Sequence, residues 1–90
     1  MNKYTEKFTK NFLNDIKKLK NKNLRSRFLK KKDEIINNPH GYKPLRNIFK
    51  GMQRIHIGSY VLIFEIKEVE KVILFHRFQH HDKAYKTKLT

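Results

Sequence analysis

Basic and imidazole side chains gather in two places where they could transfer protons. The segment His76 to Tyr85 holds three histidines, one arginine and one tyrosine. Earlier, Arg54 and His56 stand two residues apart in a run that reads as a strand, so their side chains share one face. An imidazole beside a cation can accept a proton near neutral pH. The same spacing also fits the polar outer face of an ordinary amphipathic strand, and spacing alone leaves both interpretations open.

Three histidines and one aspartate within seven residues, His76, His80, His81 and Asp82, also raise the question of a metal. A strand end followed by a turn does not reproduce the spacing of known zinc motifs, and His40 stands alone. We expect the side chain of His80, adjacent to His81, to point elsewhere and to be structural or simply exposed. The acidic residues are scattered among lysines and glycine-rich phosphate loops are absent. The sequence therefore predicts no metal and no cofactor.

Cations, imidazoles and a phenol are the groups that metal-free RNA cleavage needs. In that reaction the ribose 2′-OH attacks the neighbouring phosphorus while a base takes its proton. Cations stabilise the negative phosphorane, and an acid protonates the departing 5′ oxygen. DNA lacks the 2′-OH, so this chemistry selects RNA without reading bases. The residue types permit the reaction, although their spacing does not establish it.

The charge of the chain points to a polyanionic partner. Among 90 residues, 22 are Lys or Arg and eight are Asp or Glu, which gives a net charge of +14. Such a charge attracts phosphate backbones and releases their counterions on binding. An anionic membrane surface would be attracted too, and a lysine-rich surface can also serve solubility alone. We favour RNA, and we expect no membrane partner.

Composition predicts one small cytoplasmic domain spanning residues 1–90. Hydrophobic residues make up 38% of the chain, enough for one modest core. Cysteine is absent, which excludes disulfides and fits a reducing compartment. The first thirty residues contain no apolar run of signal-peptide length, and no stretch is long enough to span a bilayer.

Hydrophobic periodicity predicts an α+β fold. Residues 3–8 read as a short edge strand, followed by a helix that Thr9 caps and by a second helix over 24–36, which Asn38-Pro39 ends. The two helices should form an antiparallel hairpin. Short connections then predict a three-stranded antiparallel meander over 52–57, 60–67 and 71–79, with 60–67 central. A short C-terminal helix should begin near Lys83, capped by Asp82.

Several segments, in this order and spacing, resemble the RelE/ParE superfamily of bacterial and archaeal toxins. They are Pro44-Leu45-Arg46, the run from Gln53 to Ile66 that contains Gly58-Ser59-Tyr60, and the run from His80 to Lys86. The helical pair ending in Asn38-Pro39 fits as well, so the resemblance covers nearly the whole chain. It implies the RelE-like fold and a toxin that cleaves mRNA, usually in the ribosomal A site. It also implies neutralisation by a cognate antitoxin, RelB-like or DinJ-like.

The resemblance also implies roles for individual residues. His56 and His81 are similar to the histidines of YafQ-like members, which makes His81 the candidate general acid and His56 the candidate general base, with these roles exchangeable. Tyr85 falls where the family carries its terminal aromatic residue, which positions the nucleotide. The remaining candidates are basic residues. Arg54 and Lys50 are expected to stabilise the phosphorane, and those expected to contact RNA are Lys43, Arg46, Arg77, Lys17, Lys18 and Lys31.

Two alternatives stay open within the same superfamily. The ParE branch shares the fold and poisons DNA gyrase without RNA chemistry; His56, His81 and Tyr85 argue against it, because a protein-binding poison needs no acid–base residues. A catalytically inactive RNA-binding domain is the other alternative. Val61 supports it, since the family commonly carries an arginine at this place. A further departure is His81 itself, which stands where an arginine often follows the final histidine.

Overall fold

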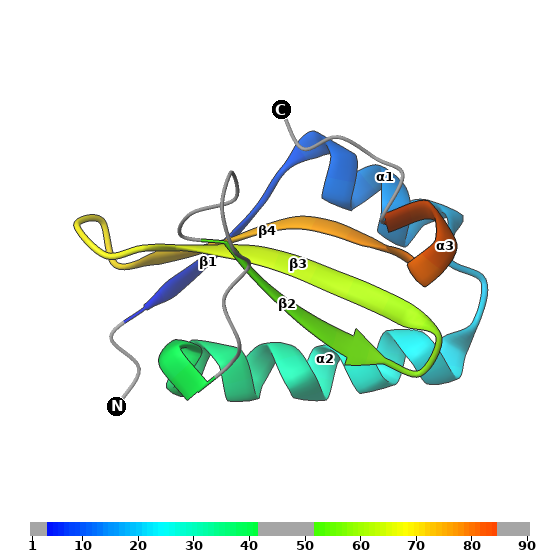
Figure 1. Ribbon diagram of the computed structural model, residues 1–90, viewed down its shortest axis with the longest axis horizontal. Helices are drawn as coiled ribbons and strands as arrows, with labels where there is room; N and C mark the ends of the chain where they lie inside the picture. The colour runs from blue at the N-terminus through cyan, green and yellow to red at the C-terminus, as the bar shows by residue number, and fades with distance from the viewer. Residues whose placement is uncertain (1–3, 42–51, 85–90) are drawn as a thin grey trace.

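The computed structural model describes residues 4–41 and 52–84. Within these ranges the elements follow the order β1 (Thr5–Phe8), α1 (Lys10–Lys18), α2 (Lys22–Asn37), the short 3-10 helix η1 (Pro39–Gly41), β2 (Met52–Ile57), β3 (Tyr60–Lys67), β4 (Val72–His80) and α3 (His81–Ala84). The class is α+β, as predicted. Figure 1 shows α1 and α2 running in opposite directions beside one mixed sheet.

The four described strands lie in the order β1-β4-β3-β2. As the short connections predicted, β3 pairs antiparallel with both β2 and β4, and the turn after β2 contains Gly58 at φ 62. β1 is an edge strand, as expected. Its partner is β4, in parallel register from Thr5↔Val72 to Phe8↔Phe75. The sequence analysis did not anticipate this pairing, because it joins segments more than sixty residues apart.

Side-chain caps define where both long helices begin. The Thr9 hydroxyl accepts a hydrogen bond from the Phe12 backbone N–H at 3.0 Å, which confirms the predicted cap of α1. The Asn21 side chain caps α2 by accepting from the backbone N–H groups of Asn23 and Leu24. This second helix therefore starts at Lys22, two residues before its first apolar side chain. It ends at Asn37, since the following Asn38-Pro39 pair cannot continue it.

The core lies between the two helices and one face of the sheet. Phe12 of α1, Phe28 of α2 and Phe75 of β4 are fully buried or nearly so, and their ring centroids lie 5.3 to 5.8 Å apart. Ring contacts of this kind add roughly 0.5–1.5 kcal/mol each beyond area burial. The core fills one face of β3 through Leu62 and Phe64, both fully buried. The aromatic cluster thus fixes both helices against the centre of the sheet.

Not every apolar residue on the predicted helix stripes enters this core. Leu13 and Leu29 are about half exposed, at 53% and 49%. Lys32, which interrupts the stripe of α2, lies beside β1, where its Nζ is 3.1 Å from a carboxylate oxygen of Glu6. Its side chain is only 17% exposed, so its aliphatic part covers apolar surface as the sequence suggested.

The described residues contain no helix that is long and apolar enough to cross a membrane.

Candidate functional site

One face of β2 carries the first pair of predicted site residues. Arg54 pairs with Ile63 of β3 and His56 pairs with Val61, so both belong to the same face, as predicted. This is the sheet face opposite the helices, because the alternate residues Gln53 and Ile57 are buried toward the core. His56 is exposed and Arg54 is half-buried.

Val61 and Ile63 form a small apolar cluster on that same face, with Met52 packed against it. Val61 is completely buried, at 0% exposure. The Val61 side chain therefore contributes no polar group to this face. On the neighbouring strand β2, Arg54 lies beside Ile63 and supplies a basic group.

The second group of predicted residues lies where β4 passes into α3. His81 continues the alignment with β3: its backbone N–H donates to the Ser59 carbonyl at 2.9 Å, and its ring Nδ1 is 3.3 Å from the same oxygen. Its Nε2 lies 3.0 Å from a carboxylate oxygen of Asp82. The ring is about half exposed. His81 is thus held on both sides at the rim of the sheet.

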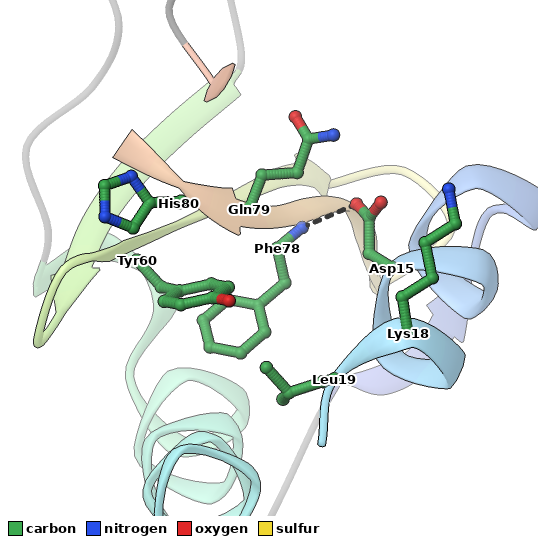
Figure 2. Close-up of a pocket in the computed structure, with 7 residues that line it drawn as sticks. All are labelled: Asp15, Lys18, Leu19, Tyr60, Phe78, Gln79 and His80. Atoms are coloured by element: carbon green, nitrogen blue, oxygen red, sulfur yellow. Dashed lines mark hydrogen bonds between the residues drawn. The ribbon is translucent and has the colours of Figure 1, made fainter. Parts of the chain in front are cut away.

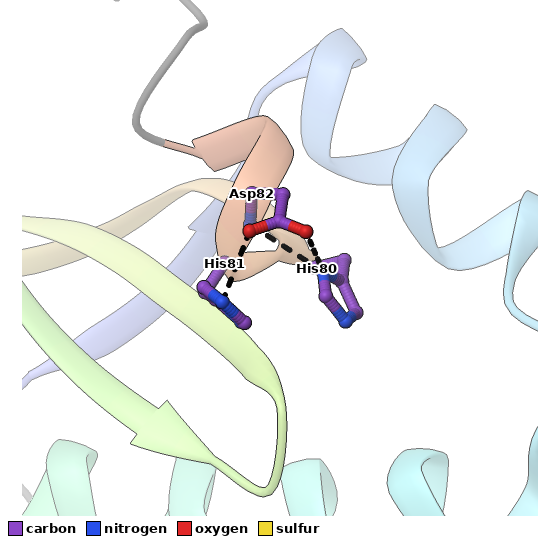
Figure 3. A group of neighbouring side chains, drawn as sticks. All are labelled: His80, His81 and Asp82. Atoms are coloured by element: carbon purple, nitrogen blue, oxygen red, sulfur yellow. Dashed lines mark hydrogen bonds and ion pairs between the residues drawn. The ribbon is translucent and has the colours of Figure 1, made fainter.

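The His80 ring does not point away from His81, so that expectation was wrong. The ring centroids are 4.6 Å apart, and the His80 Nδ1 lies 3.7 Å from Asp82. Figure 3 shows both imidazoles beside the Asp82 carboxylate. The reason is local: β4 ends at His80 and α3 begins at His81 rather than near Lys83, so strand alternation does not extend to His81. For the same reason Asp82 lies inside the first turn of the helix and is not its cap.

The two candidate acid–base histidines occupy opposite sides of β3. His56 stands opposite Val61 of β3, whereas His81 stands opposite Ser59, two residues earlier in the β2–β3 turn. Two strand spacings and one two-residue step put their Cα atoms roughly 12 Å apart. A scissile phosphate can fit between two side chains at that spacing, because each needs to approach its own oxygen to about 3 Å.

Arg77, predicted to contact RNA, is engaged within the protein. Its Nε and Nη2 donate to the two carboxylate oxygens of Asp15 on α1 at 2.9 and 3.0 Å. The same carboxylate accepts the backbone N–H of Phe78 at 3.0 Å. The Asp15 and Arg77 side chains are only 7% and 15% exposed. β1 pairs with β4 only as far as Phe75, so Asp15 satisfies an edge N–H that no strand covers.

A small pocket of about 120 Å³ separates the C-terminal end of α1 from the end of β4. Figure 2 shows Asp15, Lys18 and Leu19 on one side of it and Tyr60 and His80 on the other. The His80 ring meets the Tyr60 ring edge-on, with centroids 5.8 Å apart. The pocket is too small for a nucleotide. Its lining places the C-terminal end of α1 beside His80.

The remaining predicted RNA contacts lie on the helices or outside the described residues. Lys17 and Lys18 are exposed in the last turn of α1, and Lys31 is half-buried beside Glu34 at 3.4 Å. Lys43, Arg46, Lys50 and Tyr85 lie outside the described residues, so their predicted roles stay predictions.

A polar cluster at the far end of the sheet was not foreseen. The Tyr4 hydroxyl donates to Glu68 at 2.8 Å, the Lys71 ammonium lies 3.1 Å from the same carboxylate, and His40 contacts it as well. The hydrogen bond from Tyr4, followed by that from Lys71, lowers the pKa of Glu68 to about 2. The bond to Glu68 in turn raises the pKa of Tyr4. This cluster joins the beginning of β1 and η1 to the β3–β4 turn, far from His80 and His81.

Comparison with known proteins agrees with the fold. Residues 7–85 match the family model of the ParE toxin of type II toxin–antitoxin systems, parDE. A protein of Methanocaldococcus jannaschii, described as a candidate RelE4 toxin, is 48% identical over 61 residues, which is 67% of this chain. The match spans 65% of that relative, slightly under two thirds of its length.

Solved structures of toxins also have a similar fold. The toxin–antitoxin complex RelBE2 of Mycobacterium tuberculosis contains a chain with a TM-score of 0.74 and 26% identity, covering 86% of this chain and 96% of that one. YafQ of Escherichia coli has a TM-score of 0.75 at 18% identity, covering 92% of this chain and 99% of YafQ. At that identity the likeness to YafQ concerns the fold alone.

Proposed function

Because the chain belongs to the RelE/ParE superfamily of toxins from type II toxin–antitoxin systems, we propose that it is a metal-independent endoribonuclease that cleaves mRNA, with the ribosomal A site as its place of action. The observation that carries this proposal is that His56 on β2 and His81 at the β4–α3 junction flank the beginning of β3. Acting on translating ribosomes, the protein would work in the cytoplasm.

His81 is the proposed general acid. Its two ring nitrogens both face acceptors, the Ser59 carbonyl and the Asp82 carboxylate. Only a protonated imidazole can donate at both positions, and this is the form that an acid needs. In the reaction, His81 would protonate the departing 5′ oxygen and Asp82 would hold the ring in place.

His56 is the proposed general base, taking the proton of the 2′-OH as that oxygen attacks phosphorus. The bond from phosphorus to the 5′ oxygen then breaks, leaving a 2′,3′-cyclic phosphate and a free 5′-OH. Arg54, on the same face of β2, supports the proposal as a cation close to the developing phosphorane charge. Lys50 and Tyr85 are expected to contribute a second cation and a stacking surface.

Burial of Val61 bears on whether the chain is active. Because this side chain is enclosed between β2 and β4, position 61 supplies no cation to the open face. Transition-state charge must then be stabilised from β2 and from groups beyond the sheet. This supports a histidine-based mechanism, in which proton transfer replaces part of the electrostatic contribution of a missing arginine.

A cognate antitoxin is the proposed protein partner. The M. tuberculosis relative was solved as a toxin–antitoxin complex, and a chain of net charge +14 offers a surface for an acidic segment that folds on binding. We propose a RelB-like or DinJ-like partner. Exposed lysines of both helices, among them Lys17 and Lys18, would dock on ribosomal RNA and supply affinity rather than sequence reading.

Single-turnover cleavage of ribosome-bound mRNA tests the proposal. His81→Ala and His56→Ala should each slow cleavage by roughly a hundredfold to ten-thousandfold, the usual contribution of a positioned acid or base. His40→Ala is the matched control, because His40 is an exposed histidine at the far end of the sheet beside Glu68. A 2′-deoxyribose at the cut site should abolish cleavage. EDTA should not, provided that ribosome integrity is kept by other means.

The description of the matching family model favours one competing function, inhibition of DNA gyrase in the manner of ParE. A supercoiling assay run beside mRNA 5′-end mapping separates the two. If gyrase is inhibited, mRNA stays intact and both histidine variants keep full toxicity, the ribonuclease proposal is wrong. If neither target is affected while RNA is still bound, the chain is an inactive RNA-binding member.

A further inference from the structure

We propose that His80, His81 and Asp82 form a binding site for a divalent transition-metal ion of the zinc type. Each side chain offers one ligand atom, and these three atoms all lie within 4.8 Å of one another. Two imidazoles and one carboxylate are a donor set that suits Zn²⁺, Co²⁺ or Ni²⁺ and is poorly suited to Mg²⁺ or Ca²⁺. Figure 3 shows the three groups gathered where β4 passes into α3.

The hydrogen bonds around the cluster are compatible with ligation by its ring nitrogens. The Asp82 backbone N–H donates to His80 Nδ1 over a long distance of 3.4 Å, and an ion bound at Nδ1 would replace this contact, because the nitrogen has a single lone pair. When neutral His81 donates from Nδ1 to the Ser59 carbonyl, its Nε2 lone pair faces the Asp82 carboxylate at 3.0 Å. The His81 Nε2 lone pair and the Asp82 carboxylate oxygen repel each other at 3.0 Å unless a cation lies between them. That cation can be a proton or a metal ion.

The surroundings hold the ligands near their binding positions. The His80 ring rests edge-on against Tyr60, and His81 is fixed to the β2–β3 turn through its backbone and its ring. The three side chains are 42% to 69% exposed, so an ion can enter and water can complete its coordination shell. A net charge of +14 opposes cation binding, and affinity must therefore come from direct ligation.

Metal binding would inhibit rather than assist the reaction. This step rests on the proposed function, since the ion takes His81 Nε2, one of the two nitrogens from which the general acid can donate its proton. The site itself does not depend on that function. It follows from the positions of the three ligands alone.

Titration of the untagged chain of residues 1–90 with Co²⁺ tests the site directly. Visible absorption reports inner-shell ligation, and Zn²⁺ should displace Co²⁺ at one equivalent. In NMR spectra the ring signals of His80 and His81 should shift or broaden, and those of His56 and His76 should not. His80→Gln and Asp82→Asn should each weaken binding by roughly tenfold or more. His40→Gln should not, since His40 and Glu68 form another exposed imidazole–carboxylate pair, one with no third ligand among residues 4–41 and 52–84.

The outcomes separate the site from the function. The site is refuted if the chain does not bind Co²⁺. It is also refuted if His80→Gln and Asp82→Asn both bind Co²⁺ as tightly as the unmodified chain while their backbone amide spectra show an intact fold. If binding follows the variants but the protein cleaves no RNA, the site stands and the ribonuclease proposal fails. If the protein cleaves RNA, the cleavage rate of each variant with Zn²⁺ is compared with the rate of the same variant without metal. The unmodified chain should then be inhibited at a lower Zn²⁺ concentration than His80→Gln. Acceleration by Zn²⁺ would refute the inhibitory role.

Discussion

Removing the Asp15 carboxylate should destabilise the whole domain and not merely loosen one helix. Asp15 accepts two hydrogen bonds from Arg77 and one from the Phe78 backbone N–H, at 2.9 to 3.0 Å, with its own side chain 7% exposed. In Asp15→Ala the Arg77 guanidinium loses its counter-charge and the strand-edge N–H loses its acceptor. Breaking a buried ion pair in this way costs about 3–5 kcal/mol.

The expected magnitude is near the lower end of that range, because Arg77 is 15% exposed and can regain some water. A loss of about 3 kcal/mol corresponds to a fall in Tm of about 12–24 °C for a domain of this size. Urea and thermal unfolding followed by circular dichroism measure it. Glu34→Gln is the matched control, since its pair with Lys31 is exposed at 3.4 Å and surface pairs contribute about 0–1 kcal/mol.

A double-mutant cycle identifies the cause. Arg77→Met in the Asp15→Ala background should cost much less than Arg77→Met alone, because the interaction is already gone. If Asp15→Ala changes unfolding free energy by less than about 0.5 kcal/mol, the carboxylate does not hold α1 to β4 and this reasoning fails. The cycle also bears on the RNA-contact prediction for Arg77: a pure RNA contact would alter binding and leave stability unchanged.

Two further predictions concern charge. Glu68 has a folded pKa of about 2, below its ordinary value of 4.5, so its contribution to stability is present above pH 4.5 and is lost as pH falls toward 2. When unfolding is measured across this pH window, the free energy of unfolding should decrease less in Glu68→Gln than in the unmodified chain. Equal decreases in the two proteins would contradict this prediction. Ribosome affinity should fall linearly in log K against log salt, with a slope reduced by about one unit for each phosphate-contacting lysine reversed, such as Lys17 or Lys18; a flat response would leave the +14 charge with a solubility role only.

Local patterns in the sequence were enough for most of the fold. Thr9 as a cap, Asn38-Pro39 as a stop and Gly58 at a tight turn are each fixed by neighbouring residues, and each appears where it was predicted. The central position of 60–67 follows from its continuous apolar run and from connections too short for parallel crossovers. The shared face of Arg54 and His56 follows from strand alternation alone.

Only tertiary structure decided the contacts that join distant segments. The parallel pairing of β1 with β4 and the ion pair of Asp15 with Arg77 connect residues more than sixty positions apart, and no local pattern encodes them. The meeting of His80 with His81 depends on where one strand ends, and a one-residue difference there reverses the direction of a side chain. The sequence by itself therefore determined the residue types available for chemistry and the shared strand face of Arg54 and His56. Packing of α1 against the edge of β4 decided that Arg77 pairs with Asp15 inside the protein, because these two residues meet only in the folded chain.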